Sequence, residues 1–179
     1  QKIGIEKFKS FLKKIGILDK IEFDIEEVGE PLLFKWGKCK LATSSFGHGI
    51  TTTPLQLAKG YSIITNGGYD IKPSLIKQNK SKKSIKNKIL NEGVSDIINP
   101  VLRKVVSTKD GTAGFANIEG YQVGGKTGTA QKTLGGKYSN NKINTFVSIF
   151  PTSKPMYVLI VLLDEPKPNK EYIYNYRDG

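Results

Sequence analysis

The hydrophobic pattern changes its period near residue 120, and this change constrains the fold more than any other feature of the sequence. Beyond it, apolar and polar residues alternate or form short apolar runs, as in strands that bury at least one face. Three segments have this character: 121–132, 145–150 and 156–164. A glycine-containing loop at 135–141 and a turn at 151–155 separate them, and such short connections join neighbouring antiparallel strands. We therefore predict an antiparallel meander.

The earlier part of the chain carries helix signals instead. Apolar residues three and four positions apart predict an amphipathic helix over 3–15. A second helix, with its body at 55–65, is marked at both ends. Thr53 can serve as its N-cap, Pro54 fits the first helical position, and Asn-Gly-Gly at 66–68 favours a left-handed stop.

Ser95 is predicted to cap a third helix that continues to Val106, and residues 108–120, which are rich in glycine, are predicted to form a loop. The sequence contains no alternating strand-helix-strand pattern and no internal repeat. The expected fold class is therefore α+β, with an antiparallel sheet flanked by helices.

The residue inventory excludes several classes of function. A single cysteine, Cys39, excludes an internal disulfide and a thiolate metal cluster, and a single histidine, His48, excludes most histidine-based metal sites. We expect no metal and no cofactor. The longest apolar run, 157–163, is far shorter than the roughly 20 residues of a membrane-spanning helix and is interpreted as a buried strand.

The formal net charge of +12 is compatible with a nucleic-acid partner or an anionic membrane. However, 26 of the 28 basic residues are lysines, whereas recognition of bases and phosphates favours arginine. The lysines are scattered, apart from a cluster at 77–88 whose Asn, Gln and Ser neighbours are typical of a solvated loop. We expect no nucleic-acid partner and keep a basic interaction module as an alternative function.

Two catalytic motifs overlap between Gly120 and Thr129. Residues 120–127 fit the G-x-x-x-x-G-K-[ST] phosphate loop, whereas residues 126–128 are the K-T-G triplet of penicillin-recognising acyl-transfer enzymes. A phosphate loop needs a strand before it and a helix that begins at its Lys-Thr pair. Here a loop is predicted before Gly120, and the glycines after Thr127 disfavour a helix. The flanks favour K-T-G on a strand, with a nucleotide-binding protein as the alternative.

Strand geometry assigns the motif residues to two faces. Lys126 and Gly128 should share one face, and Thr127 and Thr129 the other. A lysine there can bind a substrate carboxylate, while Gly128 leaves room for the close approach of an acyl group. Simple alternation does not direct Lys126 and Thr127 at the same point, so the strand must expose its edge or twist. An exposed edge could also pair with an extended peptide.

Several motifs occur together in a characteristic order. Their positions are 46–50 (Phe-Gly-His-Gly-Ile), 53–58 (Thr-Pro-Leu-Gln-Leu-Ala), 66–68 (Asn-Gly-Gly), 72–73 (Lys-Pro) and 125–131 (Gly-Lys-Thr-Gly-Thr-Ala-Gln). From about Ile5 to Glu165, this arrangement resembles the class B penicillin-binding proteins, which are peptidoglycan D,D-transpeptidases, and within them the septal enzymes of cell division.

The resemblance implies a mechanism and a site. In this family a serine of an S-x-x-K motif attacks a stem-peptide carbonyl, D-alanine leaves, and the acyl group passes to an amine of a neighbouring strand. Lys126, Thr127 and Gly128 would bind the terminal carboxylate of the stem peptide or of a β-lactam. The amide of Thr129 would supply one half of the oxyanion hole, and Gln131 would contact substrate farther along the strand.

The resemblance also implies partners and a location. The expected partners are peptidoglycan stem peptides, β-lactam antibiotics and the membrane proteins of the division machinery. The expected location is the periplasmic face of the bacterial inner membrane, with the anchor outside this chain.

The nucleophile is the main departure from the family pattern. The S-x-x-K and S-x-N motifs should precede K-T-G, but the S-x-x-K matches at Ser10, Ser74 and Ser139 are about as many as chance predicts. Ser10 is predicted to lie opposite the apolar stripe of its helix, and Ser74 follows Pro73 in an extended segment. Ser139 falls in the predicted hairpin loop after K-T-G. None of them is assigned as the nucleophile.

We therefore interpret residues 1–179 as the C-terminal portion of a single transpeptidase domain, truncated at both ends, with its attacking serine upstream. The chain alone is predicted to be inactive. A meander with one covered face is short of core, so the isolated chain is also predicted to be marginally stable or prone to aggregation.

Overall fold

The computed structural model describes residues 2–26, 28–31, 35–77, 87–134 and 137–167. These residues form four α-helices, a short 3₁₀-helix and one three-stranded antiparallel sheet, so the α+β prediction is confirmed. By their internal contacts, the residues group into two compact units, Gln1–Ile98 and Asn99–Gly179.

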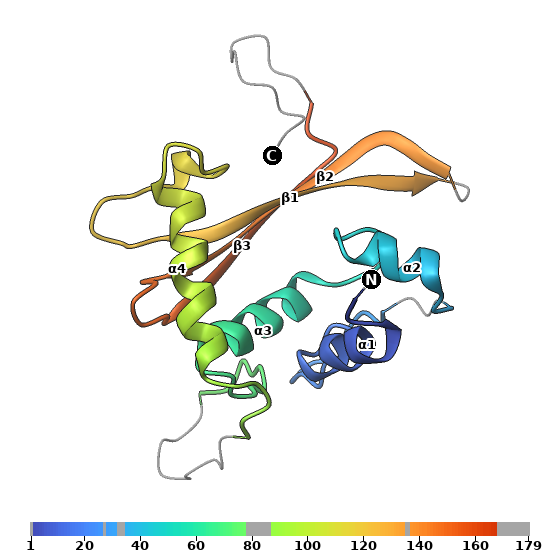
Figure 1. The fold of residues 1–179 in the computed structure, drawn as a ribbon, viewed down its shortest axis with the longest axis horizontal. Coiled ribbons are helices and arrows are strands. Elements are labelled where there is room, and N and C mark those ends of the chain that lie inside the picture. The colour runs from blue at the N-terminus through green and yellow to red at the C-terminus, as the bar shows by residue number, and fades with distance from the viewer. Residues whose placement is uncertain (1, 27, 32–34, 78–86, 135–136, 168–179) are drawn as a thin grey trace. The chain divides into compact units, whose positions relative to one another are not determined.

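The first unit contains the helices α1 (Ile5–Lys14), α2 (Lys38–Ser44) and α3 (Pro54–Thr65) (Figure 1). The apolar face of α1 and the residues after it pack against α3 in a core that includes Leu12, Ile15, Ile17 and Ile63. Both ends of α3 are as predicted. Thr53 caps its start, and Gly67 and Gly68 after its end have φ values of +94° and +86°, which favour glycine.

Gln56 connects the start of α3 to the segment after α1. Its Oε1 accepts a hydrogen bond from Thr53 N at 2.8 Å, which completes a capping box. Its Nε2 donates to the carbonyl oxygens of Ile17 at 3.2 Å and Asp19 at 3.0 Å. Because the side chain is only 1% exposed, one buried amide satisfies backbone groups from two segments far apart in the sequence.

The helix α4 (Gly93–Ser107) corrects the prediction for Ser95. Ser95 lies inside the first turn and does not cap the helix. Its buried Oγ donates to the carbonyl oxygen of Ile64 at 2.6 Å and accepts from Gly67 N at 2.8 Å. The hydroxyl therefore satisfies the end of α3, a tertiary role that a local capping pattern cannot distinguish from an N-cap.

The sheet of the second unit consists of β1 (Gly124–Leu134), β2 (Lys137–Phe150) and β3 (Tyr157–Asp164) in the order β1-β2-β3 (Figure 1). The predicted meander is confirmed. The prediction of a buried strand at 157–163 is wrong, because most side chains of β3 are exposed, with Leu159 at 50% and Leu163 at 54%. The predicted loop at 135–141 is wrong in part, because β2 already begins at Lys137, whereas residues 135–136 lie outside the described part of the chain.

The segment 108–120, predicted to be a loop, contains the 3₁₀-helix Gly114–Ala116 and packs partly against the core of the second unit. Ala113 is buried and joins Val106 and Val123 in a second core, against which Phe146 and Phe150 pack. The basic cluster predicted at 77–88 falls mostly on residues 78–86, which lie outside the described residues.

The first residues of β1 lie directly on α4. A Cβ atom at Gly124 would stand 2.9 Å from Arg103 N and 3.0 Å from the carbonyl carbon of Leu102, and it would also meet the Thr152 side chain. Arg103 Nη1 donates to the carbonyl oxygen of Val123 at 2.7 Å. Only glycine at position 124 allows this approach, which sets where the strand begins.

Replacing Gln56 with leucine should destabilise the chain. The carbonyls of Ile17 and Asp19 would lose their donor, and a buried polar group left unpaired costs about 1–3 kcal/mol. Urea unfolding of the purified chain measures the change. The control is Gln131→Leu, the same substitution at an exposed glutamine, for which a change within about 0.5 kcal/mol is expected. Equal effects of the two substitutions would contradict the role of Gln56.

Replacing Gly124 with alanine should also destabilise the chain, by about 1–3 kcal/mol, because the new methyl group overlaps backbone atoms of α4 that cannot turn away. Gly128→Ala is the matched control on the same strand. A Cβ there meets nothing closer than Thr145 O at 3.9 Å, so its unfolding midpoint should stay near that of the unmodified chain. A Gly124→Ala protein as stable as the control would refute the close approach.

Candidate active site

β1 presents the K-T-G residues at an edge of the sheet. In the described part of the chain, β1 pairs with β2 on one side and with no strand on the other. Lys126 and Gly128 are exposed, and Thr127 is half-buried. An exposed strand edge carries unpaired backbone groups, which an extended peptide can use.

The Lys126 side chain folds back toward Thr127. Its Nζ donates to the carbonyl oxygen of Thr127 at 2.8 Å and lies 3.5 Å from Thr127 Oγ1. The alternation of strand faces separates the two Cβ atoms, but the long lysine side chain spans the edge between them. An ammonium group and a hydroxyl group therefore lie together, an arrangement suited to a carboxylate.

Thr129 and Gln131 follow along the same strand and pair in register with Asn144 and Lys142. At the usual rise of a strand, Thr129 lies roughly 7 Å from Thr127, whereas Gln131 lies roughly 14 Å from it. Both side chains are exposed. The structure brings Lys126 and Thr127 together, but Gln131 is too far away to touch a carboxylate bound by that pair.

Thr112 also lies at this site, although no sequence pattern identifies it. Its Oγ1 is 3.1 Å from Thr127 Oγ1, although the two residues are 15 positions apart. The sequence predicts only a loop at 108–120. The glycine before Thr112 was a possible signal of a tight backbone, but nothing in the sequence related this position to the K-T-G strand.

The phosphate-loop alternative is wrong. Residues 124–134 are a continuous strand, so Lys126 and Thr127 lie within β1 and not at the start of a helix. A phosphate loop depends on amides at a helix N-terminus, and this geometry is absent at residues 120–127.

The serines of the S-x-x-K matches lie in three different settings. Ser10 is exposed on α1, as predicted. Ser74 Oγ donates to Asp24 Oδ2 at 2.7 Å, so a carboxylate holds this hydroxyl. Ser139 lies within β2 and not in a loop, and its Oγ accepts from Asn141 N at 3.2 Å. None of these contacts is the serine-lysine pair of an activated nucleophile.

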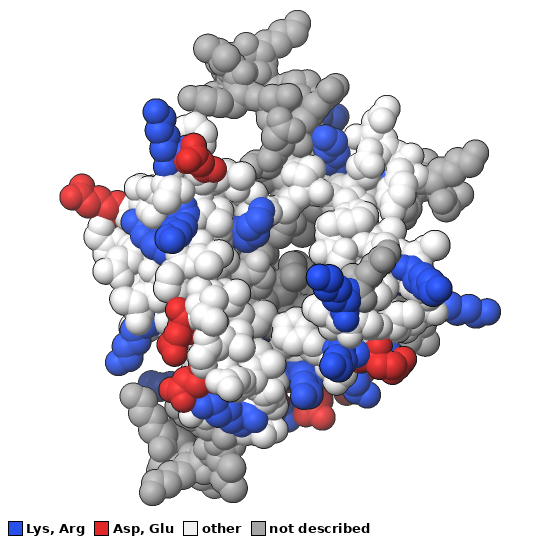
Figure 2. Space-filling view, viewed as in Figure 1, with Lys and Arg blue, Asp and Glu red and all other residues white. Residues whose placement is uncertain are grey.

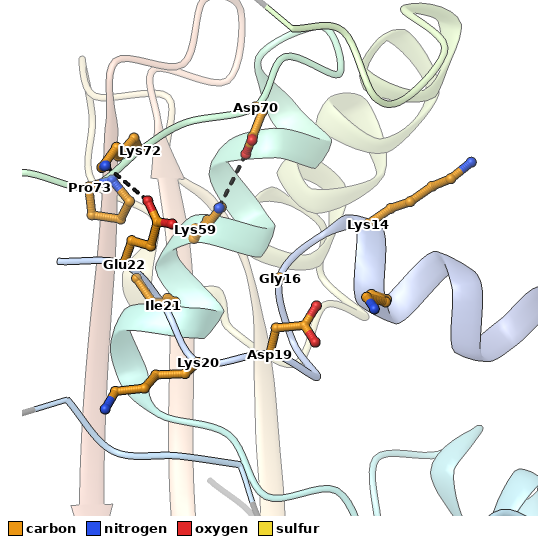
Figure 3. Close-up of a pocket in the computed structure, with 11 residues that line it drawn as sticks. Lys14, Gly16, Asp19, Lys20, Ile21, Glu22, Lys59, Asp70, Lys72 and Pro73 are labelled. Atoms are coloured by element: carbon orange, nitrogen blue, oxygen red, sulfur yellow. Dashed lines mark hydrogen bonds and ion pairs between the residues drawn. The ribbon is translucent and has the colours of Figure 1, made fainter.

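A cavity of about 360 Å³ in the first unit is a second candidate site (Figure 3). Two ion pairs occupy its wall: Lys72 Nζ lies 2.9 Å from Glu22 Oε2, and Lys59 Nζ lies 3.3 Å from Asp70 Oδ1. The Lys72 hydrogen bond lowers the pKa of Glu22, and the same bond raises the pKa of Lys72. Two of the five lysines in the wall are thus already paired with carboxylates of the wall, and we assign no ligand to this cavity.

The surface charge does not form a single basic field on the face shown in Figure 2, where acidic side chains lie among the basic ones. The described residues include no group of three or more His, Cys, Asp or Glu side chains that could hold a metal ion. None of the described helices combines the length and apolar character needed to cross a bilayer.

Comparison with known proteins relates nearly the whole chain to one family. Residues 1–177 match the penicillin binding protein transpeptidase domain. Stage V sporulation protein D of Bacillus subtilis is 35% identical over 93% of this chain and 28% of its own length. The probable peptidoglycan D,D-transpeptidase FtsI of Caulobacter vibrioides is 30% identical over 94% of this chain and 30% of its own length.

The fold gives the same result. The structure of penicillin-binding protein 3 from Mycobacterium tuberculosis, complexed with ampicillin, has a TM-score of 0.82 and 26% sequence identity, and the match covers 93% of this chain and 41% of that one. The chain spans less than a third of the length of the two sequence relatives. From the match over nearly all of its residues, we conclude that the chain belongs to the penicillin-binding protein transpeptidase domain family.

Proposed function

We propose that this chain is the C-terminal part of a peptidoglycan D,D-transpeptidase domain that cross-links stem peptides through an acyl-serine intermediate and binds penicillin in the same cleft. The observation that carries the proposal is the Lys126–Thr127 pair at the exposed edge of β1, within a chain of the transpeptidase family. The Caulobacter relative is named a D,D-transpeptidase, and the Mycobacterium structure holds ampicillin.

The substrate and the drug share the group that this site would recognise. A stem peptide ends in a D-alanine carboxylate, and a penicillin carries a carboxylate beside its reactive ring. Lys126 Nζ and Thr127 Oγ1 would donate to that carboxylate and fix the position of the scissile carbonyl along β1. Gly128 would let the ligand approach the strand, and the amide of Thr129 would donate to the oxyanion.

The reaction proceeds in two steps of acyl transfer. A serine oxygen attacks the carbonyl of the penultimate D-alanine, the peptide bond to the terminal residue breaks, and D-alanine leaves with a proton. An amine of a second stem peptide then attacks the ester carbonyl, an amide bond forms, and the serine recovers its proton. With penicillin, the bond that breaks is the ring amide, so the leaving group stays attached and the ester persists.

We propose that the attacking serine lies outside these 179 residues, because the relatives are more than three times as long and the contacts described above for Ser74 and Ser139 are not those of a nucleophile. The proposed setting is the periplasmic face of the inner membrane, beside the membrane proteins of cell division. This setting follows from the family alone.

Lys126→Ala in the full-length protein that contains this chain should slow acylation by a fluorescent penicillin by about 10- to 150-fold, since a charge-assisted hydrogen bond contributes about 1.5–3 kcal/mol. The control is Lys132→Ala on the same strand. Lys132 Nζ binds Asp164 at 3.0 Å and Glu165 at 2.8 Å, so its loss should leave acylation unchanged. Equal slowing by both substitutions would show a general charge effect and contradict the assignment.

The 179-residue chain alone should form no penicillin adduct, because the proposed nucleophile lies outside it. Mass spectrometry of the intact chain after incubation with penicillin measures this, with the full-length protein as the positive control. An adduct mapped to Ser10, Ser74 or Ser139 would overturn the proposal that the nucleophile lies elsewhere.

A further inference from the structure

We propose that Thr112, in the segment between α4 and β1, is a positioning residue that orients the Thr127 hydroxyl for the ligand carboxylate. This inference rests on the proposed function. The observation behind it is the distance of 3.1 Å between Thr112 Oγ1 and Thr127 Oγ1, next to the Lys126 ammonium group.

The arrangement of donors leaves one proton for a ligand. Lys126 can only donate, so Thr127 Oγ1 receives from it as an acceptor. The two threonine hydroxyls carry two protons, and their mutual hydrogen bond uses one. In the proposed arrangement Thr112 Oγ1 donates in that bond, so Thr127 keeps its own proton and can donate it to an anion. The Thr112–Thr127 pair is therefore a donor with a restricted direction, whereas an isolated Thr127 hydroxyl would rotate freely.

The backbone on both sides of Thr112 is fixed. Gly111 N donates to Thr108 O at 3.0 Å, and Ala113 N donates to Val105 O at 3.2 Å. A Cβ at Gly111 would collide with Val105 O, so this contact with the end of α4 requires glycine. Ala113 is 8% exposed and lies in the core of the second unit. The protein thus holds an exposed threonine between two anchored residues.

This rigidity favours a functional role over a structural one. The Thr112 side chain is exposed, so water can satisfy its hydroxyl and folding does not require the contact with Thr127. Preorganised donors bind a ligand more tightly because less rotational freedom is lost on binding. The contact should therefore affect carboxylate binding much more than stability.

Acylation kinetics of the full-length protein with a fluorescent penicillin test the proposal, because they separate the concentration that gives half-maximal rate from the limiting acylation rate. Thr112→Val removes the hydroxyl at nearly constant shape. It should raise the half-maximal concentration by about 2- to 12-fold, corresponding to one hydrogen bond of about 0.5–1.5 kcal/mol, and leave the limiting rate and the melting temperature near those of the wild type. Thr112→Ser should restore wild-type binding.

Two further variants separate positioning from other effects. Thr108→Val is the matched control, because Thr108 Oγ1 donates to Lys104 O of α4, and this variant should behave as the wild type. In a Thr127→Val background, adding Thr112→Val should have no further effect, because a residue that acts through Thr127 has nothing left to orient. An additive effect in that background would overturn the positioning role.

The outcomes distinguish this inference from the proposed function. A full-length wild-type protein that forms no penicillin adduct would refute the proposed function and this inference with it. A wild-type protein that acylates normally, together with a Thr112→Val variant of unchanged half-maximal concentration, would refute the role of Thr112 alone.

Discussion

β1 begins where its backbone passes directly over α4, and a side chain at position 124 would occupy the space of the Arg103 and Leu102 backbone atoms. This close approach fixes the position of the start of β1 relative to α4. From there, pairing with β2 sets the register, with Lys126 opposite Val147 and Thr127 opposite Phe146. The position of the K-T-G residues therefore follows from a contact made before the motif begins, between backbone atoms.

The same helix positions the other side of the site. Val105 O near the end of α4 accepts a hydrogen bond from Ala113 N, in the segment that carries Thr112. Helix α4 thus holds both Thr112 and β1, and the distance between the two hydroxyls depends on a single rigid element. A substitution that moves the end of α4 would change this distance without touching any ligand-binding group.

Much of this fold could be predicted from the sequence, because the chemistry that determines it is local. The ends of α3 follow from Thr53 and the glycines at 67–68, and the three strands follow from period-two alternation. The exceptions depend on contacts between distant residues. Ser95 is a residue type that commonly caps helices, yet its hydrogen-bond partners lie at the end of α3. The role proposed for Thr112 depends on its contact with Thr127 of β1. The seven-residue α2 was not predicted either, because so short a helix has little periodicity of its own.

The site separates recognition from stability. Lys126, Gly128 and Thr129 are exposed, whereas Val123 and Gly124 immediately before them are buried. Exposed side chains contribute little to folding, so ligand binding and not stability can determine which residues occupy these positions. The buried residues cannot vary in this way, because Val123 fills the second core and Gly124 allows the helix contact. In the proposed site, a lysine, a threonine and a glycine would thus carry carboxylate recognition on a strand whose first residues are held in place by packing.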